Sequence, residues 1–282
     1  MVPRRIPSFQ HNFCYAERTG FFLNPAMFLE KKGASMTKKI VIIDVLDDPS
    51  FDIVEVYRDL AFRVGFPRNY LVGVDGIQSI QDVRHIHDQS AGIIISGSTH
   101  NFSDLQWPEW FNDLRAIIRE YHGRVPILGI CFGHHAIASA LDGRIQRHER
   151  GREVGSVLIK RTMAGAVDLL FRSFPEVGLV RMSHGDHVVQ LPSNAILLAA
   201  NDHSGVQAFR IGTTWGIQFH PEVTPEIFHK LLGGRAEKLE MDGKHEEAKR
   251  LRNVLETVRD CPDGAEVFRN FLAACLQEGG GL

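Results

Sequence analysis

The chain has 282 residues, of which 44% are hydrophobic and 23% charged, and its formal net charge is -2. That balance is ordinary for a globular protein and gives no general attraction to nucleic acid or to a membrane surface. No apolar run approaches the roughly 18 residues of a spanning helix, and the four cysteines lack the spacing of a zinc site or a disulfide framework. We therefore expect a cytoplasmic protein that needs no metal and no cofactor.

Residues 1–35 differ from the rest, because they mix basic, aromatic and proline residues without a regular period. A targeting peptide is one interpretation, which Glu17, Glu30 and the lack of a basic amphipathic helix weigh against. A disordered tail, or an upstream start with Met36 as the true first residue, is the interpretation we favour. The expected organisation is a leader over residues 1–36 and one folded domain over residues 37–282.

Regular patterning begins at residues 39–44, an apolar, β-branched run typical of a buried strand. The spacing of apolar residues then predicts elements in alternation: a helix over 52–64, a strand at 92–97, a helix over 109–121 and a strand over 125–130. Such alternation indicates an α/β fold with right-handed crossovers and a doubly wound, mostly parallel sheet flanked by helices.

The second half of the chain is rich in strand patterns. Strands are predicted at residues 157–160, 178–182, 195–200, 206–210 and 215–219. A highly charged helical segment over 226–262 follows, and residues 264–276 read as a closing helix. The charged segment is most simply a solvated helical insert, and a surface for a partner protein is the alternative.

The sharpest local pattern is Gly129-Ile-Cys131-Phe-Gly133, between the strand at 125–130 and an apolar helix. This is the cysteine form of a strand-to-helix nucleophile elbow, in which small flanking residues permit a cramped turn. The helix N-terminus favours a thiolate and aims backbone N–H groups at a developing oxyanion. A buried structural cysteine is the alternative, since free cysteines are often buried.

A thiolate nucleophile needs a base and a group that orients the base. His220-Pro221-Glu222 follows the strand at 215–219, and residues two apart on a strand point to the same side. A lone histidine at a strand end is usually structural. The glutamate two residues on and the elbow upstream favour His220 as the base and Glu222 as its orienting carboxylate.

An oxyanion also needs backbone donors from a second element. Ser96-Gly97-Ser98 closes a strand that a doubly wound sheet places beside the elbow strand. The backbone N–H groups of Gly97, Ser98 and Phe132 are therefore the predicted oxyanion hole. An ordinary turn with a conformationally free glycine explains this segment equally well.

These residues resemble class I glutamine amidotransferase domains over roughly residues 38–225. Four motifs occur in the order usual for that family: Gly129-Ile-Cys-Phe-Gly133, Arg152-Glu-Val-Gly155, Met182-Ser-His-Gly-Asp-His-Val188 and Gly216-Ile-Gln-Phe-His-Pro-Glu-Val223. The resemblance implies the flavodoxin-like class I glutaminase fold. It also implies a Cys-His-Glu triad at Cys131, His220 and Glu222 that forms a γ-glutamyl thioester.

The resemblance further implies a substrate-side loop that offers backbone contacts to the glutamyl group. The substrate-binding residues it suggests are Ser183, His184, Gly185, Asp186 and, on the first turn of the elbow helix, His134. A metal site made of His184, Asp186 and His187 together with His203 is the alternative, and the resemblance argues against it.

Within this family, the Met182-Ser-His-Gly-Asp stretch is most similar to the glutaminase domain of GMP synthase. Two departures from the GMP synthase pattern narrow the expected function. That pattern has Gly-Gly-Pro at the oxyanion loop, where this chain has Gly97-Ser98-Thr99, and no ATP-pyrophosphatase half follows the amidase segment. The chain is more similar here to stand-alone members such as γ-glutamyl peptidases. We therefore expect a stand-alone hydrolase whose partner is a small γ-glutamyl substrate, either glutamine or a γ-glutamyl peptide. A glutaminase subunit that passes ammonia to a separate synthetase and a non-catalytic scaffold are the alternatives.

Overall fold

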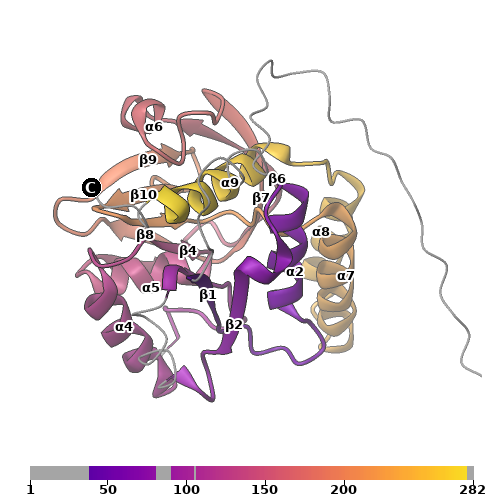
Figure 1. The fold of residues 1–282 in the computed structure, drawn as a ribbon. Helices are drawn as coiled ribbons and strands as arrows, with labels where there is room; N and C mark the ends of the chain where they lie inside the picture. Colours follow the sequence, from indigo (N-terminus) through magenta and orange to yellow (C-terminus); the bar gives the residue numbers. More distant parts are fainter. Residues whose placement is uncertain (1–37, 81–89, 105, 278–282) are drawn as a thin grey trace, which may run out of the picture. The chain divides into compact units, whose positions relative to one another are not determined.

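The computed structural model describes residues 38–80, 90–104 and 106–277 (Figure 1). The leader expected over residues 1–36 lies outside them. The described strands are β1 (Lys39–Asp44), β2 (Leu71–Asp75), β3 (Ser90–Ile95), β4 (Ile127–Ile130), β5 (Arg144–Arg147), β6 (Glu153–Arg161), β7 (Val177–His184), β8 (Asp186–Gln190), β9 (Ile196–Ala200), β10 (Ala208–Ile211) and β11 (Thr214–Ile217). The described helices are α2 (Ile53–Arg63), the short η1 (Arg68–Tyr70), α4 (Trp110–Tyr121), α5 (Phe132–Ala140), α6 (Met163–Val167), α7 (Pro225–Met241), α8 (His245–Glu256) and α9 (Pro262–Gln277).

The main sheet has the strand order β2-β1-β3-β4-β11-β10-β9-β6-β7. Its first five strands pair in parallel, and the strands from β11 to β7 pair antiparallel. β5 and β8 form a separate antiparallel ladder. The expected α/β fold with a strand-rich second half is therefore confirmed, and its sheet is mixed because the second half adds an antiparallel wing.

Helices cover both faces of the parallel block. On β1, Ile40 and Ile42 point into a core shared with α2 and α9, whereas Val41 and Ile43 point into a core shared with α4 and α5. All four side chains are at most 1% exposed. This burial on both faces explains why the parallel strands are continuous apolar runs rather than alternating ones.

Three short strands of the structure have no counterpart among the predicted elements, and each has a physical reason. β2 contains Gly73 and ends in a polar, exposed residue, β5 is mostly exposed, and β8 opens with a buried aspartate in a segment predicted as a loop. Strands of this kind lack the apolar run by which a strand is recognised in a sequence.

The charged segment forms a helical pair, as the sequence predicts. α7 and α8 lie side by side at one side of the domain (Figure 1) and share a small core of Phe228, Leu232, Ala236 and Leu251. Val154 of β6 and Val223 also pack against this core, which joins the pair to the sheet. No helix of the described residues is long and apolar enough to cross a membrane.

Candidate active site

Three neighbouring parallel strands end at the predicted site. β3, β4 and β11 are adjacent in the sheet, so their carboxyl ends meet at one edge. Ser96 follows β3, Cys131 follows β4, and the segment that leads to His220 follows β11. The carboxyl edge of a parallel sheet is where open α/β folds place their ligands.

The elbow at Cys131 has the strained backbone that its pattern predicts. Cys131 adopts φ 53° and ψ -98° immediately before α5, a region that residues other than glycine rarely occupy. A Cβ on Gly129 would lie 2.3 Å from the carbonyl oxygen of Gly133, and one on Gly133 would lie 2.4 Å from that of Ile95. Both glycines are therefore required for the turn, which projects the sulfur from the sheet edge.

His220 joins the other two predicted triad residues. Its Nδ1 donates to Oε1 of Glu222 at 2.7 Å, and its side chain also hydrogen-bonds to Cys131. Burial disfavours the imidazolium, but the Glu222 carboxylate, the Cys131 sulfur and these hydrogen bonds hold the pKa of His220 well above its ordinary value. The Glu222 side chain is 1% exposed, so the charge that orients the imidazole is shielded from water.

The loop after β3 packs directly against this group. The Ser96 hydroxyl accepts from the Val45 N–H, and the Ser96 carbonyl accepts from the N–H of Gly133, so the loop is tied to β1 and to α5. A Cβ on Gly97 would lie 3.2 Å from Cε1 of His220 and 3.9 Å from Cβ of Cys131. The loop is thus held beside the sulfur, where the oxyanion donors predicted at Gly97, Ser98 and Phe132 would have to act.

Tyr57 of α2 lies close to Glu222 and Cys131, two of the predicted triad residues, and no sequence pattern singled it out. Its side chain is fully buried. Burial and the negative charges of Glu222 and Cys131 raise the pKa of its hydroxyl well above the ordinary value, against a smaller opposing effect of the Gly97 backbone. The only sequence signal was its place on the apolar face of the helix predicted over 52–64, which does not distinguish it from core residues.

A buried polar network holds the predicted substrate-side loop. β6 and β7 pair so that Glu153 lies opposite His184, and His184 Nε2 donates to Glu153 Oε2 at 2.8 Å. Asn201 and Gln207 donate to the same carboxylate at 2.7 Å each. Burial opposes the charge of Glu153, but the hydrogen bonds from these three side chains lower its pKa overall. The network therefore joins two of the sequence motifs through a carboxylate to which the sequence interpretation assigned no role.

Asp186 anchors the other end of this loop. Its carboxylate accepts from the Ser103 N–H at 2.9 Å and from the Ser103 hydroxyl at 2.6 Å, while its backbone carbonyl accepts from Nδ1 of His184. The side chains of His184 and Asp186 are thus engaged within the protein, and Arg152 donates to the carbonyl and the hydroxyl of Ser183. Contacts from this loop to a substrate stay a prediction.

The two histidines of the elbow helix are buried. The His134 ring packs against Phe209 and Gly216 and has no exposed surface. His135 Nε2 hydrogen-bonds to Oε1 of Gln218 at 2.8 Å, and burial, followed by the charge of His184, lowers the pKa of His135 to about 4. Both rings are therefore packed against the strands beside the elbow helix. A substrate contact by His134 stays a prediction.

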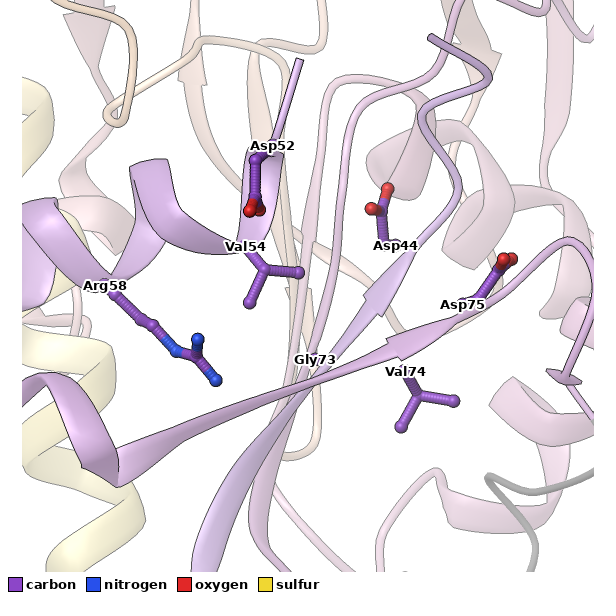
Figure 2. Close-up of a pocket in the computed structure, with 7 residues that line it drawn as sticks. All are labelled: Asp44, Asp52, Val54, Arg58, Gly73, Val74 and Asp75. Atoms are coloured by element: carbon purple, nitrogen blue, oxygen red, sulfur yellow. The ribbon is translucent and has the colours of Figure 1, made fainter. Parts of the chain in front are cut away.

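A separate cavity of about 360 Å³ opens at the ends of β1 and β2 beside α2 (Figure 2). Asp44, Asp52 and Asp75 line it together with Arg58. Each of these aspartates accepts hydrogen bonds from backbone N–H groups that follow it closely in the chain. The acidic lining is therefore explained by turn and helix capping, and we assign no ligand to it.

Comparison with known proteins identifies the family of the chain. The family model described as "Glutamine amidotransferase class-I" matches residues 56–234. The chain belongs to the class I glutamine amidotransferase family. Members of this family are generally cysteine-dependent amide hydrolases.

Two curated relatives of this chain carry names that describe different activities. The GMP synthase [glutamine-hydrolyzing] of Cytophaga hutchinsonii is 31% identical over 200 residues, which is 70% of this chain and 35% of that protein. Gamma-glutamyl peptidase 3 of Arabidopsis thaliana is 33% identical over 153 residues, 51% of this chain and 59% of that protein. The chain spans about a third of the length of the GMP synthases that it matches.

Among solved structures, a glutamine amidotransferase from Thermotoga maritima superposes with a TM-score of 0.65 at 19% identity. The superposition covers 86% of this chain and 99% of that one. At this identity the likeness shows the fold.

Proposed function

We propose that this amidotransferase is a stand-alone hydrolase that cleaves a γ-glutamyl amide through a thioester on Cys131. The observation that carries the proposal is the position of His220, which hydrogen-bonds to both the buried Glu222 carboxylate and the sulfur at the strained elbow. A nucleophile, a base and a group that orients the base are the parts that acyl transfer requires.

The geometry supports a two-step reaction. The Cys131 sulfur attacks the γ-carbonyl carbon as a thiolate, and backbone N–H groups of the Gly97–Ser98 loop and of Phe132 would stabilise the oxyanion. The imidazolium of His220 gives its proton to the departing nitrogen as the C–N bond breaks, which leaves a γ-glutamyl thioester and a free amine or ammonia. Neutral His220 then takes a proton from water, which attacks the thioester, releases glutamate and restores the thiol.

The test is a comparison of Cys131→Ala with the parent on glutamine, glutathione and γ-glutamyl dipeptides, with glutamate release as the readout. Loss of a nucleophile that acts within a triad predicts a fall of at least about 10³-fold in kcat. Cys261→Ala is the matched control, because this cysteine lies at the segment before α9 and contacts the Arg259 carbonyl rather than the triad. Parental activity of Cys131→Ala on every substrate would refute the proposal.

A second candidate is a glutaminase subunit that supplies ammonia to a separate synthetase. The similarity to about a third of the Cytophaga GMP synthase favours it. Hydrolysis of glutamine with no turnover of any γ-glutamyl peptide would support this candidate over the first. Cleavage of peptide substrates by the isolated chain would support the stand-alone hydrolase.

A further inference from the structure

Two arginines contact the loop of residues 183–186, and a third lies within electrostatic range of both. Arg147 ends β5, and Arg152 immediately precedes β6. A Cβ built on Gly185 would lie 3.2 Å from an Nη1 atom of each of these two arginines, so both guanidinium groups converge on that glycine. Nη2 of Arg152 also donates to the Ser183 carbonyl at 3.1 Å, which fixes its direction.

The third arginine, Arg235, comes from the α7 helix of the charged insert. It follows Phe228 by seven residues, close to two helical turns, and therefore shares the helix face of Phe228 and Leu232, although its own side chain is exposed. Among the described residues, no hydrogen bond or ion pair to its guanidinium is found. The family match ends at residue 234, one position before it.

The three positive charges affect one another. Burial and, next, the charge of Arg235 lower the pKa of Arg152 to about 10. Partial desolvation and the charge of Arg147 likewise lower the pKa of Arg235. The carboxylate of Asp186 lies 3.7 Å from Arg147, and it is already hydrogen-bonded to Ser103. The charge of Glu247 acts on Arg235 in the opposite sense. Two carboxylates against three guanidinium groups leave the cluster with an excess of positive charge.

The cluster also lies within electrostatic reach of the nucleophile. The Cys131 sulfur raises the pKa of Arg152, in opposition to the neighbouring arginines. A ligand whose γ-carbonyl contacts Cys131 would thus have a surface with an excess of positive charge nearby. Guanidinium groups bind planar carboxylates through paired hydrogen bonds, so a carboxylate would both relieve the repulsion and fix the ligand's orientation.

We propose that Arg147, Arg152 and Arg235 bind a carboxylate of the γ-glutamyl substrate, with Arg235 supplied by the helical insert. This rests on the proposed function and adds to it the residues that select the substrate. Two carboxylates could occupy the cluster: the α-carboxylate of the glutamyl group, or one carried by the departing amine. Both groups would bind arginine in the same way. Substrates that carry only the α-carboxylate, or both carboxylates, show which of them the cluster binds.

The experiment measures KM and kcat of the parent and of Arg235→Gln on glutamine, γ-glutamylglycine and γ-glutamylglycinamide. Loss of a hydrogen-bonded charge predicts an increase in KM of about tenfold or more for each substrate whose carboxylate binds here. An increase in KM for all three substrates would show that the cluster binds the α-carboxylate. An increase in KM for γ-glutamylglycine alone would show that it binds the carboxylate of the leaving group. In either case Arg235→Lys should recover part of the affinity, because it restores the charge.

Lys230→Gln is the matched control, since it removes one positive charge from an exposed position of the same helix. An Arg235→Gln variant that stays within about twofold of the parent on all three substrates, as this control should, overturns the inference while the proposed function stands. A parent protein that cleaves none of the three substrates refutes the proposed function and this inference with it.

Discussion

The parallel block and the antiparallel wing of the sheet carry different parts of the site. β3, β4 and β11 in the parallel block bring the Gly97–Ser98 loop, Cys131 and His220 to one edge through backbone geometry and close glycine packing. The wing contributes β6 and β7, which hold the loop of residues 183–186 through buried polar side chains. Under the proposed roles, the fold would fix the chemistry through its backbone, whereas substrate selection would depend on side chains that can change independently.

Glu222→Gln tests the parallel block and should have the largest effect of the three changes that follow. The amide keeps the shape of the carboxylate but removes the charge that orients His220 and favours its imidazolium form, so kcat should fall by about 10²- to 10⁴-fold. Because Glu222 raises the pKa of His220, the pH at which activity is lost on the alkaline side should also move downward. A pH profile of kcat/KM measures both, and an unchanged profile would contradict the assigned role.

Gly97→Ala tests the same block and is expected to have a smaller effect on kcat. The new methyl group would lie 3.2 Å from Cε1 of His220, so either the ring or the loop must shift. We expect kcat to fall by about 10- to 100-fold, because a displaced oxyanion donor is worth up to about 10²- to 10³-fold. Gly205→Ala is the matched control, since a Cβ there meets no atom within 4 Å. Equal kinetics of the two variants would show that the loop is not part of the chemistry.

Glu153→Gln tests the wing and should act mainly on stability. Its amide would place a donor against three side chains that donate to the carboxylate, at a cost of about 2–4 kcal/mol in the free energy of unfolding. Urea denaturation measures this, with the exposed Glu149→Gln as a control expected within about 0.5 kcal/mol of the parent.

The stability of the same variant should also depend less on pH than that of the parent. Glu153 has a folded pKa below its ordinary value of 4.5, so its contribution to stability is present above that pH and is lost as the pH falls through the folded pKa. Glu153→Gln should therefore lose less stability than the parent on acidification. A variant as acid-sensitive as the parent would show that another group controls this transition.

The sequence predicted the parallel block better than the wing for a physical reason. Buried parallel strands are apolar runs, and the elbow is a local five-residue pattern, so β1, β4 and Cys131 could be located from short segments. The Glu153 network joins side chains from separate elements that are adjacent only after folding. The mostly exposed β5 has a single apolar residue, Ile145, which is too little to predict a strand. Arg235 looked like one more charge on a solvated helix, because nothing in its own segment indicates what it faces.

The small core of α7 and α8 has a thermodynamic consequence. Only four buried side chains define it, so the free energy that keeps this pair in place is expected to be smaller than that of the central sheet. Through the proposed contact of Arg235 with a carboxylate, bound substrate would add its own binding energy to that docking by mass action. Substrate affinity and the stability of the docked helical pair would then be thermodynamically linked. A substitution at the far end of α7 or α8 could change substrate affinity without any change at the Cys131 elbow.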